Sequence, residues 1–596
     1  MRKPNYDRFP EVAVTGFSDA VWSGYADLGA GIQSKVSTHK SSRVVVAVEC
    51  YPGVIDSECL SALQHELNPV MTVNASSANL DADHIRDMLK RDLTDDRVRG
   101  YLNNSWKMED FFDAEKVAGS KAEIAAISGG LVLVYGTGAT LLCEPDVLVY
   151  ADMARWEIQL RYRREEIANW CDDNFGEDFL RMYKRGFFID WRVADRHKLT
   201  VFDRIDFLLD TNEIGSPKMI SGDAFRAGLE QTANQPFRIV PYFDSGPWGG
   251  QWMKEVCQLD PDMPNYAWCF DGVPEENSLL LNYGGTRIEV PSIDVVLFQP
   301  LELLGNMVHA RFGREFPIRF DLLDTIQGGN LSLQVHPTTE YIQQHFGIPY
   351  TQDESYYMLA AEEDAVVYLG VKNGVDPDEM VAALERAQSG KEDFNAEQFV
   401  NVIPAKQHDH FLIPGGMVHC SGGDGMVLEI SATPYIFTFK LWDWGRLGMD
   451  GKPRPIHIDH GANVIDYNFD TDMVMREAVN CIEPMGDGDG WREERTGLHE
   501  REFIESRRHW FTKSVPHDTK GVFHILNLVQ GDEALVESPI GAFEPFVVHF
   551  AETFIIPAAV GKYTIKPVND GEECATMKAY VRGGAEAEWN YVRSRI

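Results

Sequence analysis

The chain has 596 residues, with 55 Lys and Arg against 92 Asp and Glu, which gives a formal net charge of −37. This acidic surplus argues against nucleic acid or an anionic membrane as the main partner. The nine cysteines are scattered without a C-x-x-C pair, and no stretch of 18 or more apolar residues occurs. We therefore expect a cytoplasmic protein without disulfides, without a cysteine zinc cluster and without a membrane span.

Apolar runs alternate with amphipathic segments through residues 1–290. The apolar run at 41–53 ends in a Pro-Gly turn and is followed by a helical pattern at 54–67. Segments 131–142 and 146–164 repeat this order, and the second ends in a basic amphipathic helix. Because strands that alternate with helices form parallel sheets covered on both faces, we predict an α/β domain here.

The pattern changes at residue 291, where short strands separated by Gly and Pro begin. Many short strands at such spacing predict a sandwich or a barrel. A helical insert at 376–390 interrupts them, with Asp376 before Pro377 at its start and Gly390 at its end. These residues are typical helix start and stop signals.

Segment 483–499 is rich in Gly and charged residues, so we predict a linker there. Short strands resume after it and continue through 500–596. The chain is therefore predicted to be multidomain, with an α/β domain at 1–290 and all-β domains at 291–482 and 500–596.

Residues that can bind a metal lie along the first β segment. In LSLQVHP (331–337), Gln334 and His336 fall on one face because side chains alternate along a strand. Glu354 lies just before another apolar strand, and His419 follows a Gly-Gly turn. Imidazole, carboxylate and amide oxygen suit a catalytic zinc or a similar divalent metal. Taken alone, each signal is weak, because a single histidine on a strand is more often a satisfied core or surface residue than a metal ligand.

Four motifs follow one another between residues 295 and 465: LSLQVHP, DESYYML, IPGGMVHCSGGDGMVLEIS and LWDWGRLGMDGKPRPIHID. In this order they resemble the motifs of the class I mannose-6-phosphate isomerase family. The resemblance implies a cupin fold, or jelly roll, with one divalent metal in its barrel, Zn²⁺ first among the candidates. It also implies a second, metal-free cupin-like domain at 500–596. The implied metal ligands are Gln334, His336, Glu354 and His419.

The resemblance further implies the interconversion of mannose 6-phosphate and fructose 6-phosphate through a cis-enediol. That reaction needs a Lewis acid or a cation where oxygen gains charge, and basic side chains for the phosphate. We expect Lys440 and Arg446 to act in catalysis, and Lys452, Arg454 and His457 to bind the substrate. The expected partner is thus a small sugar phosphate, and homo-oligomer formation is left open.

Three positions depart from the family pattern. Lys440 stands where the family has an arginine, and Gln352 and Asp321 stand where it has lysines. The loss of two cations favours an alternative function, that of a non-catalytic cupin that binds a sugar and signals through the N-terminal domain.

The N-terminal segments resemble uridine-kinase-like P-loop proteins, in which a strand such as that from Asp146 to Asp152 leads into an Arg-rich helix. However, ECYPGVID (49–56) offers one glycine and no lysine where phosphoryl transfer needs G-x-x-x-x-G-K-[ST]. We therefore expect a degenerate kinase-like domain with a structural or regulatory role. The alternative is a bifunctional kinase–isomerase.

Overall fold

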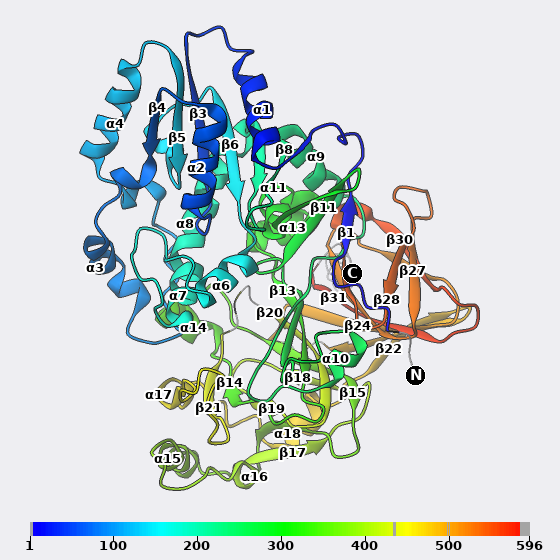
Figure 1. Cartoon of the computed structure of the whole chain (residues 1–596). Helices are drawn as coiled ribbons and strands as arrows, with labels where there is room; N and C mark the ends of the chain where they lie inside the picture. The colour runs from blue at the N-terminus through cyan, green and yellow to red at the C-terminus, as the bar shows by residue number, and fades with distance from the viewer. Residues whose placement is uncertain (1–3, 433–434, 436, 498, 500, 584–596) are drawn as a thin grey trace, which may run out of the picture. The chain divides into compact units, whose positions relative to one another are not determined.

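The computed structural model describes residues 4–432, 435, 437–497, 499 and 501–583 (Figure 1). The chain forms two compact units, each of which is discontinuous in sequence. The α/β unit comprises residues 11–231 and 278–294, and the β unit comprises 1–10, 232–277 and 295–596. No helix in the described ranges is both long and apolar enough to cross a bilayer.

The predicted boundary at residue 290 is wrong because the chain enters the β unit earlier and then returns. Segment 278–294 belongs to the α/β unit, where β11 (Ser278–Tyr283) pairs in parallel with β1 (Glu11–Ala13) and antiparallel with β12 (Thr286–Pro291). These backbone hydrogen bonds join residues far apart in the sequence, so a local pattern does not reveal them.

The described part of the α/β unit contains a seven-stranded sheet in the order β2-β8-β7-β6-β3-β5-β4. Five neighbouring strands are parallel, as the alternation of strands and helices predicted. The strands are β2 (Val21–Ser23), β3 (Arg43–Cys50), β4 (Met71–Asn74), β5 (Gly130–Gly136), β6 (Val147–Asp152), β7 (Phe207–Asp210) and β8 (Lys218–Ser221).

Helices cover this sheet (Figure 1). Val46 and Val48 of β3 belong to one buried apolar cluster with Leu28 of α1 and Leu63 of α2, because alternate side chains of a central strand point to the same covering layer. The principal helices are α1 (Tyr25–Val36), α2 (Asp56–Leu67), α3 (Ala82–Leu93), α4 (Ala114–Ala126), α6 (Arg155–Arg163), α7 (Phe179–Arg185) and α8 (Trp191–Val201).

The first barrel of the β unit consists of two antiparallel sheets, the arrangement expected of a jelly roll. Among the described residues, one sheet has the order β18-β15-β20-β13-β10-β9 and the other β17-β16-β19-β14-β21. Strands β9 (Tyr242–Asp244) and β10 (Trp268–Gly272) come from the segment that the sequence assigned to the N-terminal domain. The predicted helical insert is present as α15 (Pro377–Gln388), and the Asp376 side chain caps its N-terminus.

The remaining strands of the first barrel are β13 (Ile318–Asp324), β14 (Leu333–Val335), β15 (Glu354–Ala361), β16 (Val366–Val371), β17 (Val400–Pro404), β18 (His410–Ile413), β19 (Val418–Ser421), β20 (Gly425–Ala432) and β21 (Phe439–Trp442).

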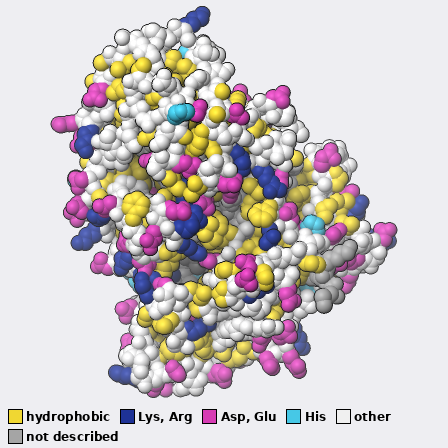
Figure 2. Space-filling model, viewed as in Figure 1, with side chains coloured by type: hydrophobic (Ala, Val, Ile, Leu, Met, Phe, Trp, Pro, Cys, Tyr) yellow, Lys and Arg dark blue, Asp and Glu magenta, His cyan; other side chains and the backbone are white. Residues whose placement is uncertain are grey.

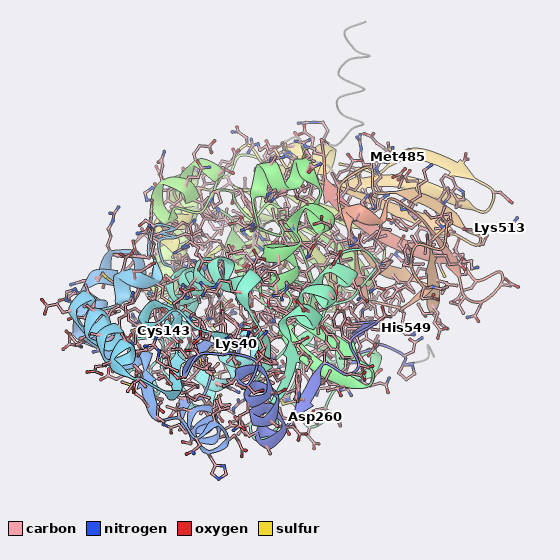
Figure 3. All side chains as sticks on the ribbon, turned by 90° about the horizontal axis from the view of Figure 1, so that it is seen from above. Lys40, Cys143, Asp260, Met485, Lys513 and His549 are labelled. Atoms are coloured by element: carbon pink, nitrogen blue, oxygen red, sulfur yellow. The ribbon has the colours of Figure 1, made fainter. Side chains whose placement is uncertain are left out.

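The predicted linker at 483–499 is wrong, because β22 (Glu483–Gly488) and β23 (Trp491–Gly497) form a hairpin. Gly490 supplies the positive φ of its turn, and the Lys513 ammonium pairs with Asp489 beside it. Figure 3 shows Met485 and Lys513 at this edge of the second barrel. The charged residues that suggested a linker are those of an exposed edge hairpin.

The second barrel also has two antiparallel sheets, which over the described residues have the orders β22-β23-β24-β31-β26-β29 and β25-β30-β27-β28. One half of its interior is apolar, with Phe511, Leu526 and Phe554 in the core. The strands are β24 (Ile504–Phe511), β25 (Val515–Asp518), β26 (His524–Gln530), β27 (Glu533–Glu537), β28 (Phe546–His549), β29 (Thr553–Ile556), β30 (Lys562–Pro567) and β31 (Cys574–Val581).

Charged side chains are spread over the face of the molecule drawn in Figure 2. Acidic side chains are scattered widely there, and basic side chains occur singly or in small groups among them. This distribution agrees with the acidic composition.

Candidate metal centre

Strand β14 carries polar side chains toward the interior of the first barrel. Gln334 lies directly opposite His419 of β19 on one side and Lys440 of β21 on the other. Residues in direct opposition project from the same face of a sheet, and His336 lies two residues farther along that face. Leu333 and Val335 point the other way and are fully buried.

Glu354 opens β15 in the opposite sheet and meets both histidines. Its Oε2 lies 3.0 Å from Nε2 of His336, and its Oε1 lies 3.1 Å from Nε2 of His419. The side-chain amide of Gln334 lies 3.3 Å from Nε2 of His419. Either its nitrogen or its oxygen can occupy that position, because the two are exchanged by a simple flip of the amide.

Backbone carbonyls determine which nitrogen of each imidazole carries a proton. Nδ1 of His336 lies 3.0 Å from the carbonyl oxygen of Phe437, and Nδ1 of His419 lies 2.9 Å from that of Met417. A carbonyl only accepts hydrogen bonds, so each Nδ1 is a donor and each neutral ring keeps its lone pair on Nε2. Both lone pairs therefore face the Glu354 carboxylate.

This donor set fits a divalent metal. Nε2 of His336 and Oε1 of Glu354 are buried and have no hydrogen-bond partner among the described residues. Ligand atoms that each lie about 2.1 Å from one tetrahedral zinc ion are about 3.4 Å apart, so a bound ion would need only a small expansion of the separations of 3.0 and 3.1 Å seen here. Burial raises the pKa of Glu354, whereas His336 and His419 lower it below its usual range when each Nε2 carries a proton, so protons and a metal ion would both stabilise the carboxylate here.

A tight turn aligns the strands that carry the two histidines. The backbone N–H of Gly416 donates to the carbonyl oxygen of His336, and that of Gly415 donates to Asp353 at 2.8 Å. Gly416 has a φ of +94°, which a residue with a side chain adopts only with strain. The Pro-Gly-Gly sequence thus fixes the entry into β19 next to β14.

The opposite sheet places further acidic groups beside Glu354. Glu429 of β20 pairs directly with Asp321 of β13 and Tyr356 of β15. Burial raises the pKa of Glu429 well above its usual range, and the nearby Glu354 and Asp321 carboxylates raise it further. Glu429 was not among the predicted site residues, although an acidic residue within the apolar run GMVLEIS was a usable signal.

Gln352 links these groups, although the sequence analysis considered it only as a lost lysine. Its amide nitrogen lies 3.2 Å from both Glu354 and Glu429, and its oxygen accepts a hydrogen bond from the N–H of Phe437 at 2.7 Å. Asp321 forms a buried ion pair with Arg319 at 2.8 Å. Each replacement of an expected lysine is thus part of a hydrogen-bonded or ion-paired network.

The predicted catalytic and substrate-binding residues do not form one cluster. Half-buried Lys440 lies beside Gln334, on the same face of the sheet. Arg446 and Arg454 instead meet at Asp443, at 2.7 and 3.1 Å, and Asp443 also accepts a hydrogen bond from Ser332.

Ser332 precedes Gln334 by two residues on the same side of the β14 segment, so this cluster lies about 7 Å along the strand from Gln334. Lys452 is on an exposed turn, where its carbonyl oxygen accepts a hydrogen bond from the N–H of Gly448. His457 is buried, its backbone N–H donates to the carbonyl oxygen of Lys440, and its ring lies 6.1 Å from that of Phe439.

Different parts of the chain are similar to different known families. Residues 24–234 match the model of a family described as a domain of unknown function, DUF8485. The kinase-like character expected for the N-terminal domain is therefore not shown, and it stays a proposal.

Curated relatives share sequence with about two fifths of the chain. The mannose-6-phosphate isomerase ManA of Bacillus subtilis is 26% identical over 236 residues, which are 39% of this chain and 68% of that protein. The mannose-6-phosphate isomerase of Streptococcus mutans is 28% identical over 224 residues, which are 37% of this chain and 64% of that protein. The probable mannose-6-phosphate isomerase GmuF of B. subtilis is 30% identical over 232 residues, again 39% and 68%.

The chain thus spans about two thirds of the length of these curated relatives. A solved structure of the mannose 6-phosphate isomerase from B. subtilis superimposes with a TM-score of 0.47 at 18% identity, covering 58% of this chain and all of that one. From the sequence similarity to GmuF, we conclude that the chain belongs to the mannose-6-phosphate isomerase family.

Proposed function

We propose that the first barrel is a metal-dependent aldose–ketose isomerase that interconverts mannose 6-phosphate and fructose 6-phosphate. The observation that carries this proposal is the buried meeting point of His336, Glu354 and His419. Each ring there is held by a backbone carbonyl so that Nε2 faces the carboxylate. The first metal to test is zinc, because two imidazoles and a carboxylate are typical zinc ligands.

The reaction transfers a proton between C1 and C2 of the sugar and places negative charge on the neighbouring oxygen. A bound divalent metal would supply Lewis acidity for that oxygen. Lys440 projects beside Gln334, so its ammonium lies where a second cation can stabilise the same charge. Glu429 is buried next to Glu354, and we propose it as the group that holds a proton close to the reacting carbons.

The phosphate would bind at the cluster around Asp443. Arg446 and Arg454 present guanidinium groups there, and both are partly buried. A phosphate would compete with Asp443 for these groups, and Arg is well suited to hold it through two hydrogen bonds. Lys452 and His457 are assigned to substrate binding by the family resemblance alone.

Hydrogen exchange at C2 tests this function. The full-length protein, loaded with zinc, is incubated in D₂O with mannose 6-phosphate, fructose 6-phosphate and the free sugars, and deuterium at C2 of each aldose and at C1 of each ketose is followed by NMR. We expect exchange with the phosphorylated pair that disappears after chelation and returns with zinc. If no aldose or ketose in the panel exchanges at full metal occupancy, the proposed reaction is wrong.

A second candidate is a sugar-binding protein without catalysis. It is favoured by Gln352 and Asp321, which leave the wall around Glu354 rich in acids rather than lysines. In that case, the same sugars would bind by calorimetry in a metal-dependent manner, whereas the C2 hydrogen would stay in place. One set of samples therefore separates the two candidates.

We also propose that the α/β unit does not transfer phosphate. The loop after β3 lacks the phosphate-binding lysine, and the first turn of α2 holds Asp56 and Glu58. Full-length protein with radiolabelled ATP should label no sugar or nucleoside. Clear product formation would instead support the bifunctional kinase–isomerase.

A further inference from the structure

The α/β unit has a cavity of about 520 Å³ at the carboxyl edge of its parallel strands. Its walls come from the loop after β3 (51–57), the segment after β4, the turn after β5 (136–137) and the segment 166–175 between α6 and α7. In the strand order of the sheet, β4 lies on one side of β3 and β6 lies on the other, so the chain reverses its direction across the sheet between β4 and β6. Open α/β sheets bind ligands at such a reversal of strand order.

The chemistry of the lining disfavours an anionic ligand. None of the residues that line the cavity is Lys, Arg or His. The lining instead combines carboxylates, side-chain amides and aromatic rings: Asp56, Glu166, Asp172, Asp173, Asn74, Asn79, Asn169, Tyr51, Trp170 and Phe175. Such a wall presents hydrogen-bond acceptors beside flat apolar surfaces.

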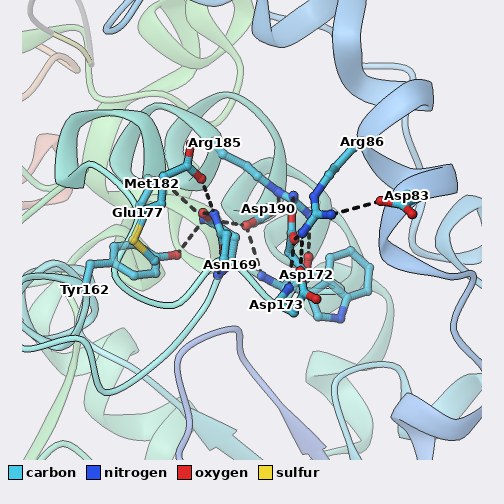
Figure 4. Close-up of polar contacts among 12 residues, drawn as sticks. Asp83, Arg86, Tyr162, Asn169, Asp172, Asp173, Glu177, Met182, Arg185 and Asp190 are labelled. Atoms are coloured by element: carbon cyan, nitrogen blue, oxygen red, sulfur yellow. Dashed lines mark hydrogen bonds and ion pairs between the residues drawn. The ribbon is translucent and has the colours of Figure 1, made fainter.

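Three of the four acids in this lining are already neutralised. Asp172 pairs with Arg86 and Arg185, Asp173 also pairs with Arg86 (Figure 4), and Glu166 pairs with Arg164 at 2.9 Å. In these pairs arginine balances the charge of the carboxylates, so the acids stabilise the wall of the cavity and do not repel a ligand.

Asp56 differs from them, since it has no ion pair within the described part of the chain. It begins α2 and shares the first turn with Glu58. The exposed N–H groups of a helix N-terminus would otherwise attract a phosphate. Here the two carboxylates already supply negative charge to that end of the helix, so a phosphate would meet repulsion.

The segment 166–175 has almost no regular secondary structure, yet it is fixed in place. The Asn169 amide nitrogen donates to Tyr162 and to the carbonyl oxygen of Met182, each at 3.0 Å, and to Asp190 at 3.1 Å. Figure 4 shows this network together with the ion pairs of Arg86 and Arg185. A cavity whose wall is already ordered loses little entropy when a ligand binds.

Two features of the lining remain without a partner in the fold. The Phe175 ring is 62% exposed at the rim, where it offers a flat apolar surface. Oδ1 of Asn79 is buried and has no hydrogen-bond partner among the described residues. An apolar surface and an unsatisfied acceptor in one cavity fit a ligand that offers both an apolar face and donors.

We propose that this cavity binds a neutral, polyhydroxylated ring compound. Its hydroxyls would donate to the Asp56 carboxylate and to Oδ1 of Asn79, and its apolar face would stack on Phe175 or Trp170. A free aldose and a nucleoside share this chemistry. The site is separate from the metal centre and does not depend on the function proposed for it.

Calorimetry on the full-length His336→Ala protein tests the proposal, because that substitution removes the metal centre as a competing sugar site. The titrants are mannose, glucose and fructose in one arm, uridine and adenosine in the other, and inorganic phosphate and ATP in a third. Saturable binding in the first arm would identify a sugar, and in the second a nucleoside.

Two variants locate the binding, each with a matched control. Asp56→Lys and Phe175→Ala should each weaken it by about tenfold or more, the loss expected for one stacking or charged contact. Asp27→Lys reverses an exposed charge in the first turn of α1 instead, and Phe9→Ala removes a phenylalanine that is 54% exposed elsewhere. Both controls should bind as the parent protein does.

Three results would overturn the proposal: no saturable binding in either neutral arm, equal binding in Asp56→Lys and Phe175→Ala, or tighter binding of phosphate or ATP than of every neutral compound.

Discussion

The two barrels of the β unit both bury histidines, but they use them differently. In the first barrel, backbone carbonyls hold Nδ1 of His336 and His419, and a carboxylate lies between the two Nε2 atoms. In the second barrel, His509 donates to Glu493 at 3.1 Å, and His524 lies 2.7 Å from the Tyr563 hydroxyl. The rings there are bound to side chains rather than oriented toward a common point.

The two barrels also differ in whether basic side chains lie beside the buried carboxylate. In the second barrel Glu493 also faces Arg507 at 3.0 Å and Lys578 at 3.7 Å, so its charge is already balanced. Among the described residues, His336, Glu354 and His419 are the one group of such side chains whose ligand atoms all lie within 4.8 Å of one another. Buried histidines alone therefore do not indicate a metal; a shared carboxylate without a neighbouring cation does.

The largest expected effect concerns the ligands themselves. We predict that His336→Ala and His419→Ala each lose the metal and reduce turnover by more than about 10³-fold, beyond the effect of removing a single electrostatic group. Elemental analysis and steady-state kinetics measure both. His517→Ala in the second barrel is the control and should keep its metal. Full metal occupancy in either first-barrel variant would contradict the assignment.

The next largest loss of activity is expected from substitution of Lys440. Because its cation would act mainly in the transition state, Lys440→Met should lower kcat by about 10²–10³ with normal metal content and little change in KM. Lys440→Arg should retain activity. Lys578→Met removes the corresponding kind of cation from the second barrel and should leave kcat unchanged. An unaltered kcat in Lys440→Met would exclude this residue from the mechanism.

Acid should destabilise the second barrel. Burial, and then the Lys578 ammonium, lower the pKa of His509 to about 4, below the value of about 6.5 in an unfolded chain. Its contribution to stability is complete above about pH 6.5 and is lost as the pH falls toward 4, by roughly 3 kcal/mol. The protection factors of amides in β24 and β25, which are corrected for the intrinsic pH dependence of hydrogen exchange, should therefore fall between pH 7 and 5. His509→Gln should flatten this dependence, and an equally steep profile in that variant would show that another group is responsible.

The smallest effect compares two glycines. Gly416 in the first barrel and Gly561 in the second both have positive φ, +94° and +66°, so alanine strains each by about 1–2 kcal/mol. A Cβ at Gly416 would also lie 3.1 Å from the Asp466 side chain, whereas Gly561 faces open space. Urea unfolding should thus show a larger loss for Gly416→Ala, by about 1 kcal/mol. Equal losses would mean that the turn before β19 is not tightly constrained.

Local patterns were sufficient for much of the fold. The parallel sheet, the short strands from residue 318 onward and the helix at 377–388 follow from periodicity and capping residues, whereas residues 293–312, where strands were predicted to begin, form helices instead. The structure also brings Gln334, His336, Glu354 and His419 together, because strand alternation determines which side chains enter the barrel. Their role as metal ligands stays a prediction.

Long-range pairing accounts for what could not be predicted. The boundary at 290 is wrong because β11 pairs with β1, about 270 residues away, and the linker at 483–499 is wrong because its charged residues belong to a hairpin. Likewise, nothing local showed that Arg446 and Arg454 share Asp443, a contact that depends on the loop folding back on itself.

The interrupted course of the chain also bears on its synthesis. Strand β10 leaves the ribosome well before β13, its neighbour in the sheet, and about 45 residues lie between them. At translation rates of about 5–20 residues per second, one edge of β10 would remain without its partner for roughly 2–10 s. During that interval the nascent chain would depend on chaperones to avoid pairing with another strand.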